Sequence, residues 1–375
     1  MLRLLSANAY RHVGDYGWHA NDRWWGLATF VTLGLSKNDW SAVRAPFFDN
    51  RTVSARVKRS YGGAHEVTVG FKIANSKFIS PVMQRKEGIF MKIVQECDLT
   101  AYNTYRIVSV ARKAYFPETV EEVRSLFVEG DLRKKVILGG GSNVIFSYSR
   151  YDDIDFIVLR DNFSRLSLDG QLMTAQAGTL LSEMIERGYE SGLGGMETYF
   201  DIPGTIGGAV VMNAGMNEDE ISCHLEQVTW LERSTGAIVS KPAKDLVWGY
   251  RYSEFQKRER IVLEAVVRLQ AGDVPMFRKK RDDIVAKRHA GQPWEQPNAG
   301  SVFKRPQGRF VGQMLEELGL KGTNIGGMEI SKKHAGFIVN TGGGTGADVL
   351  RLIELVTVTV REKYGISLEA EQIVI

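Results

Sequence analysis

The first stretch whose residue types could do chemistry is Val136–Phe146, which reads VILGGGSNVIF. An aliphatic run, Val136–Leu138, predicts a buried strand, and three glycines followed by Ser142 and Asn143 come directly after it. Because glycine has no Cβ, such a turn can bring backbone N–H groups close to a bound anion, for which a pyrophosphate is the obvious candidate. The same pattern is typical of a tight turn, and it lacks the Gly-Lys-Ser/Thr ending of an ATP-type loop and the G-x-G-x-x-G spacing.

A second glycine-rich tract, Asp201–Gly215, reads DIPGTIGGAVVMNAG. Its glycines again allow a close backbone approach, and an asparagine supplies an amide. The residues that could approach a ligand are Pro203, Gly204, Gly207, Gly208 and Asn213. Two such tracts could hold one extended ligand from two sides, and the alternative is a buried turn in a β-rich core.

Four further positions carry groups suited to electrostatic or acid–base chemistry. Arg251, in Gly249-Tyr250-Arg251, places a planar cation beside an aromatic ring, although most arginines are solvated surface groups. Ser301 follows a glycine and precedes apolar residues, so its hydroxyl could face a cleft or serve an ordinary turn. G-x-S-x-G is absent, and no histidine is spaced to make Ser301 a hydrolase nucleophile. Glu369 and Glu371 are two apart on a predicted strand and are therefore expected on one face.

The elements that must position these groups mix helices and strands without a strict βαβα repeat, so the predicted fold class is α+β. Thr119 and Glu122 form a capping box that begins a helix, which we expect to end at Gly130. Asp169-Gly170 between two apolar runs predicts a β-hairpin. Further expected elements are strands over 154–159 and 261–269, a hairpin over 228–239, helices over 180–189, 275–288, 310–318 and 347–364, and a terminal strand over 366–375.

Composition limits the classes of protein that the chain can belong to. With 43% hydrophobic and 25% charged residues the chain is typical of soluble globular proteins. No apolar run reaches about 18 residues, so no membrane span is predicted, and the N-terminal apolar stretch is too short for a convincing signal peptide. Cys97 and Cys223 suit a reducing compartment, so we expect a cytoplasmic protein. Six scattered histidines give no metal-ligand spacing, so we expect no metal site.

Residues 1–90 differ in composition from the rest of the chain. They contain 13 Lys and Arg against 6 Asp and Glu, whereas the remainder contains 35 against 38, and they hold four of the seven tryptophans. A basic aromatic segment could bind nucleic acid, but an appendage or small β-rich unit with solvated charges is the preferred interpretation. A sharper hypothesis is that Met91 is the natural start, because regular patterning begins after it. Mass spectrometry of the native N-terminus tests this, and abundant peptides from before Met91 would contradict it.

Taken in order, the motifs identify a family. NTYRI (Asn103–Ile107), LGGGSN, IPGTIGGAVVMNAG, GYRYS, AGSVFKRP, IGG…KHAGFIVN and LEAE resemble those of the UDP-N-acetylenolpyruvoylglucosamine reductases. The likeness covers essentially Met91–Ile375, and GGGSN, IPGTIGG and GSVFK in this order are highly specific together. The chain departs from the family at Met216–Glu220, which lacks the Tyr-Gly residues common there. Arg251 and Ser301 lie only 50 positions apart, which is similar to the family branch without an inserted substrate-capping loop.

The resemblance implies a two-lobed FAD-binding domain of the vanillyl-alcohol-oxidase (PCMH) type over 91–271, with lobes at about 91–160 and 161–271. A smaller α+β substrate-binding reductase domain would follow over 272–375. The implied cofactor is FAD, with NADPH as hydride donor, and the implied partner is a UDP-sugar rather than nucleic acid or membrane; we expect a monomer. By motif position, the cofactor-binding residues are Asn103, Thr104, Gly139, Gly140, Gly141, Ser142, Asn143, Pro203, Gly204, Gly207, Gly208 and Asn213.

The reaction that the resemblance implies is reduction of the enolpyruvyl group of UDP-N-acetylglucosamine enolpyruvate to UDP-N-acetylmuramate, in peptidoglycan precursor synthesis. Hydride would pass from FAD N5 to the terminal carbon of the double bond. Arg251, with Glu371 in its acid form, would stabilise the enolate-like charge, and Ser301 would protonate the second carbon. A serine that donates a proton needs no partner histidine. The implied substrate-binding residues are Tyr250, Lys304 and Arg305.

Two other functions stay open from the sequence. Another FAD-dependent oxidase of the same scaffold, acting on a sugar lactone or hydroxy acid, accounts for the glycine tracts but not for the joint presence of Arg251, Ser301 and Glu371. A non-enzymatic nucleotide- or nucleic-acid-binding protein led by the basic N-terminus would be colourless when purified.

Overall fold

The computed structural model describes residues 66–68, 82–86, 89–127, 133–216, 219–257 and 259–375, with side chains from Met91 onward. The chain divides into two compact units, Met1–Ser54 and Ala55–Ile375, and all described residues belong to the second. Most of the basic segment 1–90 therefore lies outside the described residues. No helix of the described part is long and apolar enough to cross a membrane.

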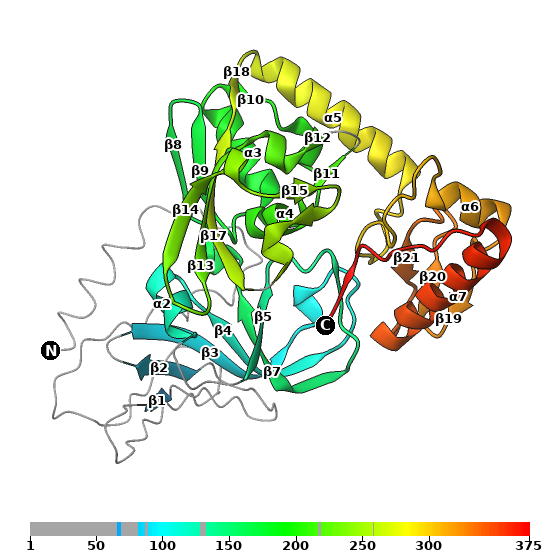
Figure 1. Cartoon of the computed structure of the whole chain (residues 1–375), viewed down its shortest axis with the longest axis horizontal. Helices are drawn as coiled ribbons and strands as arrows, with labels where there is room; N and C mark the ends of the chain where they lie inside the picture. Colours follow the sequence, from blue (N-terminus) through cyan, green and yellow to red (C-terminus); the bar gives the residue numbers. More distant parts are fainter. Residues whose placement is uncertain (1–65, 69–81, 87–88, 128–132, 217–218, 258) are drawn as a thin grey trace, which may run out of the picture. The chain divides into compact units, whose positions relative to one another are not determined.

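The first lobe is built on a six-stranded mixed sheet (Figure 1). The strands, in spatial order, are β1 (Glu66–Thr68), β2 (Val82–Lys86), β3 (Ile89–Asp98), β4 (Val110–Phe116), β7 (Arg150–Val158) and β5 (Lys134–Leu138). The first four pair antiparallel, and β4, β7 and β5 pair parallel. The boundary predicted at Met91 falls inside β3, which begins at Ile89. Whether Met91 is the natural start stays a prediction.

Local sequence explains α2 (Val120–Ser125), an α-helix of this lobe. The predicted capping box is confirmed, because the Thr119 side chain accepts from the backbone N–H of Glu122 and the Glu122 carboxylate accepts from that of Thr119. The helix is shorter than expected, since its C-cap is Leu126. Gly130, the expected end, lies outside the described residues.

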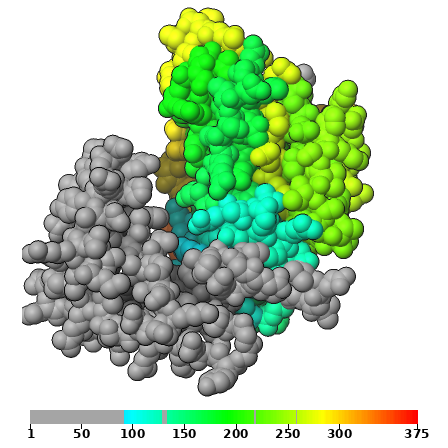
Figure 2. Space-filling view, turned by 90° about the vertical axis from the view of Figure 1, so that its left-hand side faces the viewer, coloured from blue at the N-terminus to red at the C-terminus, as the bar shows by residue number. Residues whose placement is uncertain are grey.

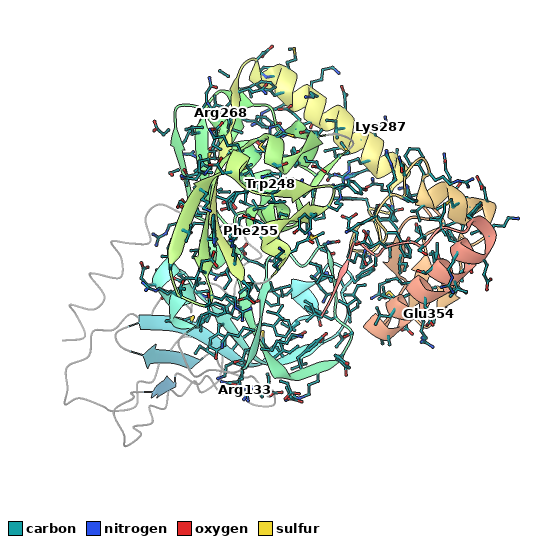
Figure 3. All side chains as sticks on the ribbon, in the orientation of Figure 1. Arg133, Trp248, Phe255, Arg268, Lys287 and Glu354 are labelled. Carbon is teal, nitrogen blue, oxygen red and sulfur yellow. The ribbon has the colours of Figure 1, made fainter. Side chains whose placement is uncertain are left out.

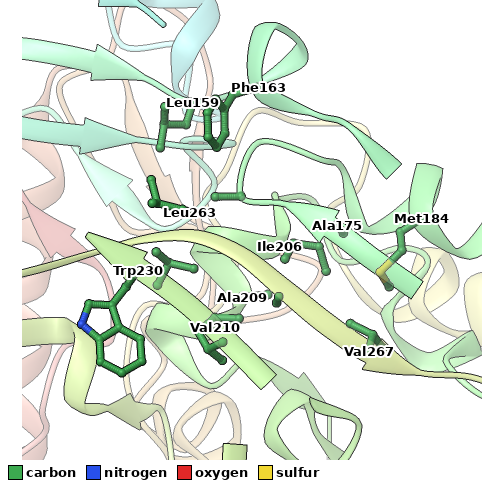
Figure 4. Packing of buried hydrophobic residues seen from close by; sticks show 14 of the residues in the cluster. Leu159, Phe163, Ala175, Met184, Ile206, Ala209, Val210, Trp230, Leu263 and Val267 are labelled. Carbon is green, nitrogen blue, oxygen red and sulfur yellow. The ribbon is translucent and has the colours of Figure 1, made fainter. Parts of the chain in front are cut away.

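The second lobe holds a five-stranded antiparallel sheet. Its strands, in spatial order, are β14 (Ile238–Pro242), β13 (Leu225–Glu232), β17 (Arg260–Arg268), β9 (Leu172–Gln176) and β8 (Leu166–Asp169). The predicted hairpin at Asp169-Gly170 is confirmed, with Gly170 at φ +57°. Helices α3 (Leu181–Glu190) and α4 (Ile206–Met212) belong to this lobe. In Figure 4, Ile206, Ala209 and Val210 of α4 pack with Leu263 and Val267 of β17.

A long helix, α5 (Val274–Gly291), leads from the second lobe to the C-terminal part (Figure 1). This part contains α6 (Val311–Glu317), α7 (Gly346–Tyr364) and a small sheet of β19 (Asn324–Ile325), β20 (Met328–Ile330) and β21 (Ile338–Asn340). A Thr345–Asp348 capping box begins α7, and Gly365 ends it in the left-handed region, so the helix predicted over 347–364 is confirmed to within one residue. Short pairs complete the fold, namely β6 (Val144–Ile145) with β22 (Ile373–Val374), β10 (Leu193–Gly194) with β18 (Gln270–Ala271), β11 (Gly215–Met216) with β12 (Asp219–Glu220), and β15 (Trp248–Gly249) with β16 (Tyr252–Ser253).

Two apolar cores hold these parts together; one crosses the predicted lobe boundary and the other crosses the predicted domain boundary. The first joins the first lobe, through Ile157 and Leu159, to the sheet and helices of the second lobe. The first lobe lies directly against the second in the space-filling view (Figure 2). The other core joins the opposite side of the first lobe, including Phe146 and Phe156, to α6 and α7. The first lobe is therefore shared between both cores.

The predicted terminal strand over 366–375 is wrong. Only Ile373–Val374 forms a strand, paired parallel to β6, while Ala370 makes an isolated bridge to Phe303. The backbone of this segment pairs with Phe303 of the C-terminal part at Ala370 and with β6 of the first lobe from Ile373 onward. A continuous ladder cannot form along a segment that changes partner within four residues, although its alternating side chains are typical of a strand.

Candidate active site

A cleft of about 750 Å³ brings the predicted chemistry together. Both glycine tracts line it, as do the end of α5 and the serine-containing and glutamate-containing segments of the C-terminal part. The predicted site residues that line it are Gly139, Gly140, Gly141, Ser142, Asn143, Pro203, Gly204, Gly207, Gly208, Arg251, Ser301, Lys304 and Glu371.

The first glycine tract is glycine-rich because other parts of the backbone approach it closely. A Cβ on Gly140 would lie 2.7 Å from the Cα of Gly204, so the two tracts touch through their backbones. Gly141 has φ +66°, and a Cβ there would lie 1.9 Å from the Tyr102 carbonyl oxygen. A side chain on either residue would force the walls of the cleft apart.

Ser142 and Asn143 fix this tract to the other walls of the cleft. The Ser142 hydroxyl donates to the carbonyl oxygen of Pro203. The Asn143 side-chain amide donates to the backbone carbonyl oxygen of Glu371 at 3.2 Å, and the backbone carbonyl of Asn143 accepts from Ile373 N–H at 2.9 Å. Both side chains thus organise the cleft through protein contacts.

The second tract is a turn followed by a short helix. The Thr205 side chain caps α4, and Gly204 before it has φ +157°. Gly207 and Gly208 lie inside this helix but serve different needs. A Cβ on Gly207 would meet Ala177 at 2.8 Å, so this glycine permits packing, whereas a Cβ on Gly208 would make only an ordinary contact, with Thr205 Oγ1 at 3.7 Å.

Three predicted cofactor residues do not line the cleft. Asn103 is buried, and its amide bonds to the backbone of Leu99 and Ile107. The Thr104 backbone N–H donates to the Gly141 carbonyl at 3.1 Å, so this residue supports the glycine turn from behind.

Asn213 is fully buried and ends α4 in the left-handed region at φ +45°. Its amide donates to Glu220 and Gly249 and accepts from Ser222 N–H. Both polar atoms of the Asn213 side chain are therefore bonded within the protein, and its role toward FAD stays a prediction.

Arg251 and Glu371, 120 positions apart in the chain, form the central pair of the cleft. The Arg251 Nε lies 3.0 Å from Glu371 Oε1, with side chains 18% and 16% exposed, and its Nη2 donates to the Gly215 carbonyl at 2.7 Å. Arg251 has φ +53°, a conformation that is costly outside glycine and that clusters at functional sites. Burial raises the pKa of Glu371, and Arg251 and then Lys304 partly oppose it. The site therefore holds a carboxyl that is disposed to keep its proton.

Ser301 stands beside this pair on a segment tied to the C-terminal tail. It bridges Phe337, and the adjacent Val302 carbonyl accepts from Glu371 N–H at 2.8 Å. Its side chain is exposed to the cleft rather than packed in the core. Lys304 Nζ lies 2.6 Å from Glu369, whose side chain is 71% exposed, so the two glutamates predicted on one face differ sharply in burial.

The other two predicted substrate residues lie at the rim of the cleft. The Tyr250 hydroxyl accepts from Arg305 N–H at 3.3 Å, and the guanidinium of Arg305 lies over the ring of Phe310. Neither Tyr250 nor Arg305 is among the lining residues. Their contact joins the second lobe to the C-terminal part just outside Arg251.

Sequence reasoning missed Arg288, Trp294 and Asn298, which line the wall between α5 and Ser301. Arg288 belongs to a helix with charged residues on all sides, so no periodicity distinguishes it from solvated arginines. Asn298 accepts from Gly300 N–H at 3.0 Å and so holds the turn before Ser301. Its place in the NAGS motif was the available signal.

The cleft fits a large, partly anionic cofactor. Its volume lies within the roughly 300–1,000 Å³ range of ligand sites. On one side of the cleft, the backbones of the two glycine tracts lie too close together to leave room for a Cβ. Elsewhere in the cleft, the buried Nε and Nη1 of Arg288 have no hydrogen-bond partner among the described residues. Among the described residues, no group of three or more His, Cys, Asp or Glu could hold a metal ion.

Comparison with known proteins defines first the class and then the family. Residues 111–240 match the FAD binding domain family, and this match covers parts of both lobes and both glycine tracts, so the chain is a flavoprotein. Residues 292–375 match the C-terminal domain of UDP-N-acetylenolpyruvoylglucosamine reductase.

Similarity to individual relatives extends over most of the chain. The chain is 42% identical over 279 residues to UDP-N-acetylenolpyruvoylglucosamine reductase of Francisella tularensis. The aligned region covers 74% of this chain and 98% of the relative. The Exiguobacterium sibiricum reductase is 40% identical, with coverages of 76% and 94%. The crystal structure of the Thermus caldophilus reductase superimposes with a TM-score of 0.66 at 30% identity, over 76% of this chain and 99% of that one.

The chain therefore belongs to the UDP-N-acetylenolpyruvoylglucosamine reductase family of peptidoglycan synthesis and is an FAD-dependent oxidoreductase. The predicted α+β class with a two-lobed FAD-binding domain is confirmed. The roles assigned to individual site residues stay predictions.

Proposed function

We propose that this enzyme uses NADPH to reduce the enolpyruvyl group of UDP-N-acetylglucosamine enolpyruvate, forming UDP-N-acetylmuramate. The observation that carries the proposal is the half-buried Arg251–Glu371 pair, which lines the same cleft as Ser301 and both glycine tracts. FAD, when bound, supplies hydride exchange between NADPH and the substrate. The residues of the chain stabilise the developing charge and supply the proton.

The substrate's double bond is conjugated to a carboxylate, so negative charge moves toward that carboxylate as hydride adds. Arg251 is held by Glu371 and by the Gly215 carbonyl, so its cation needs no rearrangement to meet this charge. The raised pKa of Glu371 favours its acid form, which can donate a hydrogen bond to the developing enolate.

Ser301 then supplies the proton that completes the reduction. Its hydroxyl is exposed to the cleft and belongs to a segment hydrogen-bonded to the glutamate tail. A positioned proton donor contributes about 10²–10⁴-fold to the rate of such a step.

The proposal is tested by separating the two half-reactions. Enzyme reduced with NADPH under anaerobic conditions should recover oxidised-flavin absorbance when the enolpyruvyl sugar is added without oxygen. Recovery only on admitting air would favour the flavin oxidase alternative, and a colourless protein would favour the nucleotide-binding one.

The proton-donor role is tested with Ser301→Ala. This variant should be reduced by NADPH at the normal rate but form product about 10²–10⁴-fold more slowly. Ser191→Ala, an exposed serine outside the cleft, is the matched control and should leave both half-reactions unchanged. Near-normal turnover by Ser301→Ala would refute the assignment.

A further inference from the structure

The short β11–β12 hairpin of the second lobe contacts the arginine of the central pair. Arg251 Nη2 donates to the carbonyl oxygen of Gly215 on β11 at 2.7 Å. Glu220, which pairs with Gly215 across the hairpin, accepts from the Asn213 amide at 2.6 Å. The same amide donates to the carbonyl oxygen of Gly249 at 3.0 Å, just before the turn that carries the arginine. The direction of the guanidinium therefore depends on where this hairpin lies.

The hairpin is too short to fix its own position. Its strands, Gly215–Met216 and Asp219–Glu220, contribute two residues each. An isolated two-stranded hairpin is at best marginally stable in water, even when its strands are longer. The strand residue that Arg251 contacts cannot carry an anchoring side chain, because a Cβ on Gly215 would lie 2.2 Å from the Asp219 carbonyl oxygen. The hairpin therefore needs an anchor from another of its residues.

The Asp219 carboxylate supplies this anchor. It accepts from Thr198 Oγ1 at 2.7 Å and from the Tyr199 hydroxyl at 3.0 Å, both on the 3-10 helix η4 (Glu197–Tyr199). Its Oδ1 also lies 2.7 Å from His224 Nε2. Tyr199 is fully buried, so the hairpin is tied to a fixed part of the second lobe.

The protonation state of Asp219 suits this role. Burial acts to raise the pKa of its carboxyl, but the hydrogen bonds from Thr198 and then His224 outweigh burial and hold the pKa below its usual value. Hydrogen bonds to an ionised acceptor are roughly twice as strong as those between neutral groups. The anchor is therefore stronger than the few backbone bonds of the hairpin itself.

We propose that Asp219 is a positioning residue of the reaction, which holds the Gly215 carbonyl where it orients Arg251. Asp219 is not among the residues that line the cleft, so it acts on the substrate through the arginine. It lies in 216–220, the segment whose sequence departs from the family motifs. The inference rests on the charge-stabilising role proposed above for Arg251.

The test is a double-mutant cycle between Asp219 and Arg251, measured in both half-reactions. In Asp219→Ala, NADPH should reduce the flavin at the normal rate, whereas anaerobic reoxidation by the enolpyruvyl sugar should slow about 10- to 100-fold. The loss should fall on the maximal rate rather than on the half-saturating substrate concentration, because the charge develops only during hydride addition. In an Arg251→Lys background, Asp219→Ala should slow reoxidation at most about twofold further, because the contact that it supports is already lost.

A conservative variant separates positioning from a general loss of structure. Asp219→Asn keeps an acceptor oxygen and the shape of the side chain, so it should recover most of the reoxidation rate. Thr198→Ala removes one of the bonds to the carboxylate and should slow reoxidation in the same direction by a smaller factor. If Asp219→Ala does not fold or does not retain FAD, Thr198→Ala is taken through the same cycle with Arg251→Lys.

Glu226→Ala is the matched control, because it removes another ion-paired carboxylate of the second lobe that does not line the cleft. Figure 3 shows Arg268, the partner of Glu226, apart from Trp248 of the hairpin that carries the arginine. This variant should leave both half-reactions unchanged.

Three results would overturn the inference. They are normal reoxidation of Asp219→Ala, an equal slowing of both half-reactions, and the same fold-loss from Asp219→Ala with and without Arg251→Lys. Failure of the proposed function is distinct from these, because the wild-type enzyme would then not be reoxidised by the enolpyruvyl sugar at all.

Discussion

Replacing Gly140 by alanine tests whether the contact between the two glycine tracts shapes the cofactor site. The added Cβ would lie 2.7 Å from Gly204 Cα and 3.4 Å from its carbonyl carbon. Because carbon atoms prefer about 3.5–4.0 Å, the tracts must separate by about 0.8–1.3 Å, and backbone offers no flexible side chain to move aside. Overpacking of this kind costs about 1–3 kcal/mol. If that cost falls on cofactor binding, the Kd for FAD rises about 5- to 150-fold.

The assay is FAD titration of the apoprotein, with thermal unfolding of the apoprotein measured in parallel. Gly140 lies outside the positive-φ region, so alanine adds no backbone strain of its own. Gly208→Ala places a methyl in the cleft without a protein clash, so it should weaken FAD binding while leaving the Tm of the apoprotein unchanged. Gly291→Ala, with open space around its Cβ, should alter neither. FAD affinity and Tm at wild-type values in Gly140→Ala would refute the reasoning.

Three further outcomes follow from the site. Arg251→Lys loses the geometry that reaches both Glu371 and the Gly215 carbonyl, and kcat/KM should fall about 10²–10³-fold in steady-state assays; an unchanged value would remove Arg251 from the charge-stabilising role. Burial raises the pKa of Glu371, so its acid form persists to higher pH and kcat/KM should decline as pH rises through that pKa; in Glu371→Gln this decline should vanish from the pH profile, and its persistence would assign it to another group. Because the pKa is higher in the folded state, this carboxyl's contribution to stability also falls as pH rises from its unfolded value to the raised one. Asn213→Ala should lower the free energy of unfolding by about 1–3 kcal/mol in urea while FAD affinity of the folded protein stays unchanged; the reverse pattern would restore Asn213 as a cofactor ligand.

Residues whose type is demanded by backbone geometry were predictable from the sequence. Gly140, Gly141 and Gly204 are glycines because of close approaches or positive φ, and the sequence shows this requirement directly. The capping boxes at Thr119 and Thr345 are local in the same sense. Local interactions join residues that are only a few positions apart in the chain, so motifs and their spacing predict them.

Residues whose side chains could serve either the fold or a ligand were harder to place. Asn103 and Asn213 sit in the right motifs, yet their amides bond to nearby backbone and side chains rather than facing the cleft. A buried asparagine that holds a turn and one that contacts a ligand have the same sequence signature. Arg288 shows the opposite case, because a cleft cation within a helix charged on every side carries no local signal.

Glu371 shows why the site needs all three parts of the structure at once. Its backbone N–H donates to Val302 of the C-terminal part, its carbonyl accepts from Asn143 of the first lobe, and its carboxylate meets Arg251 of the second. Its pKa is raised mainly by burial, which exists only while these three surfaces enclose it. Any separation of the lobes would therefore hydrate the carboxyl, lower its pKa and break its contact with Arg251. The acid form of Glu371 and the oriented Arg251 are thus produced by the same closure, so a hydrogen-bond donor and a fixed cation face the cleft together.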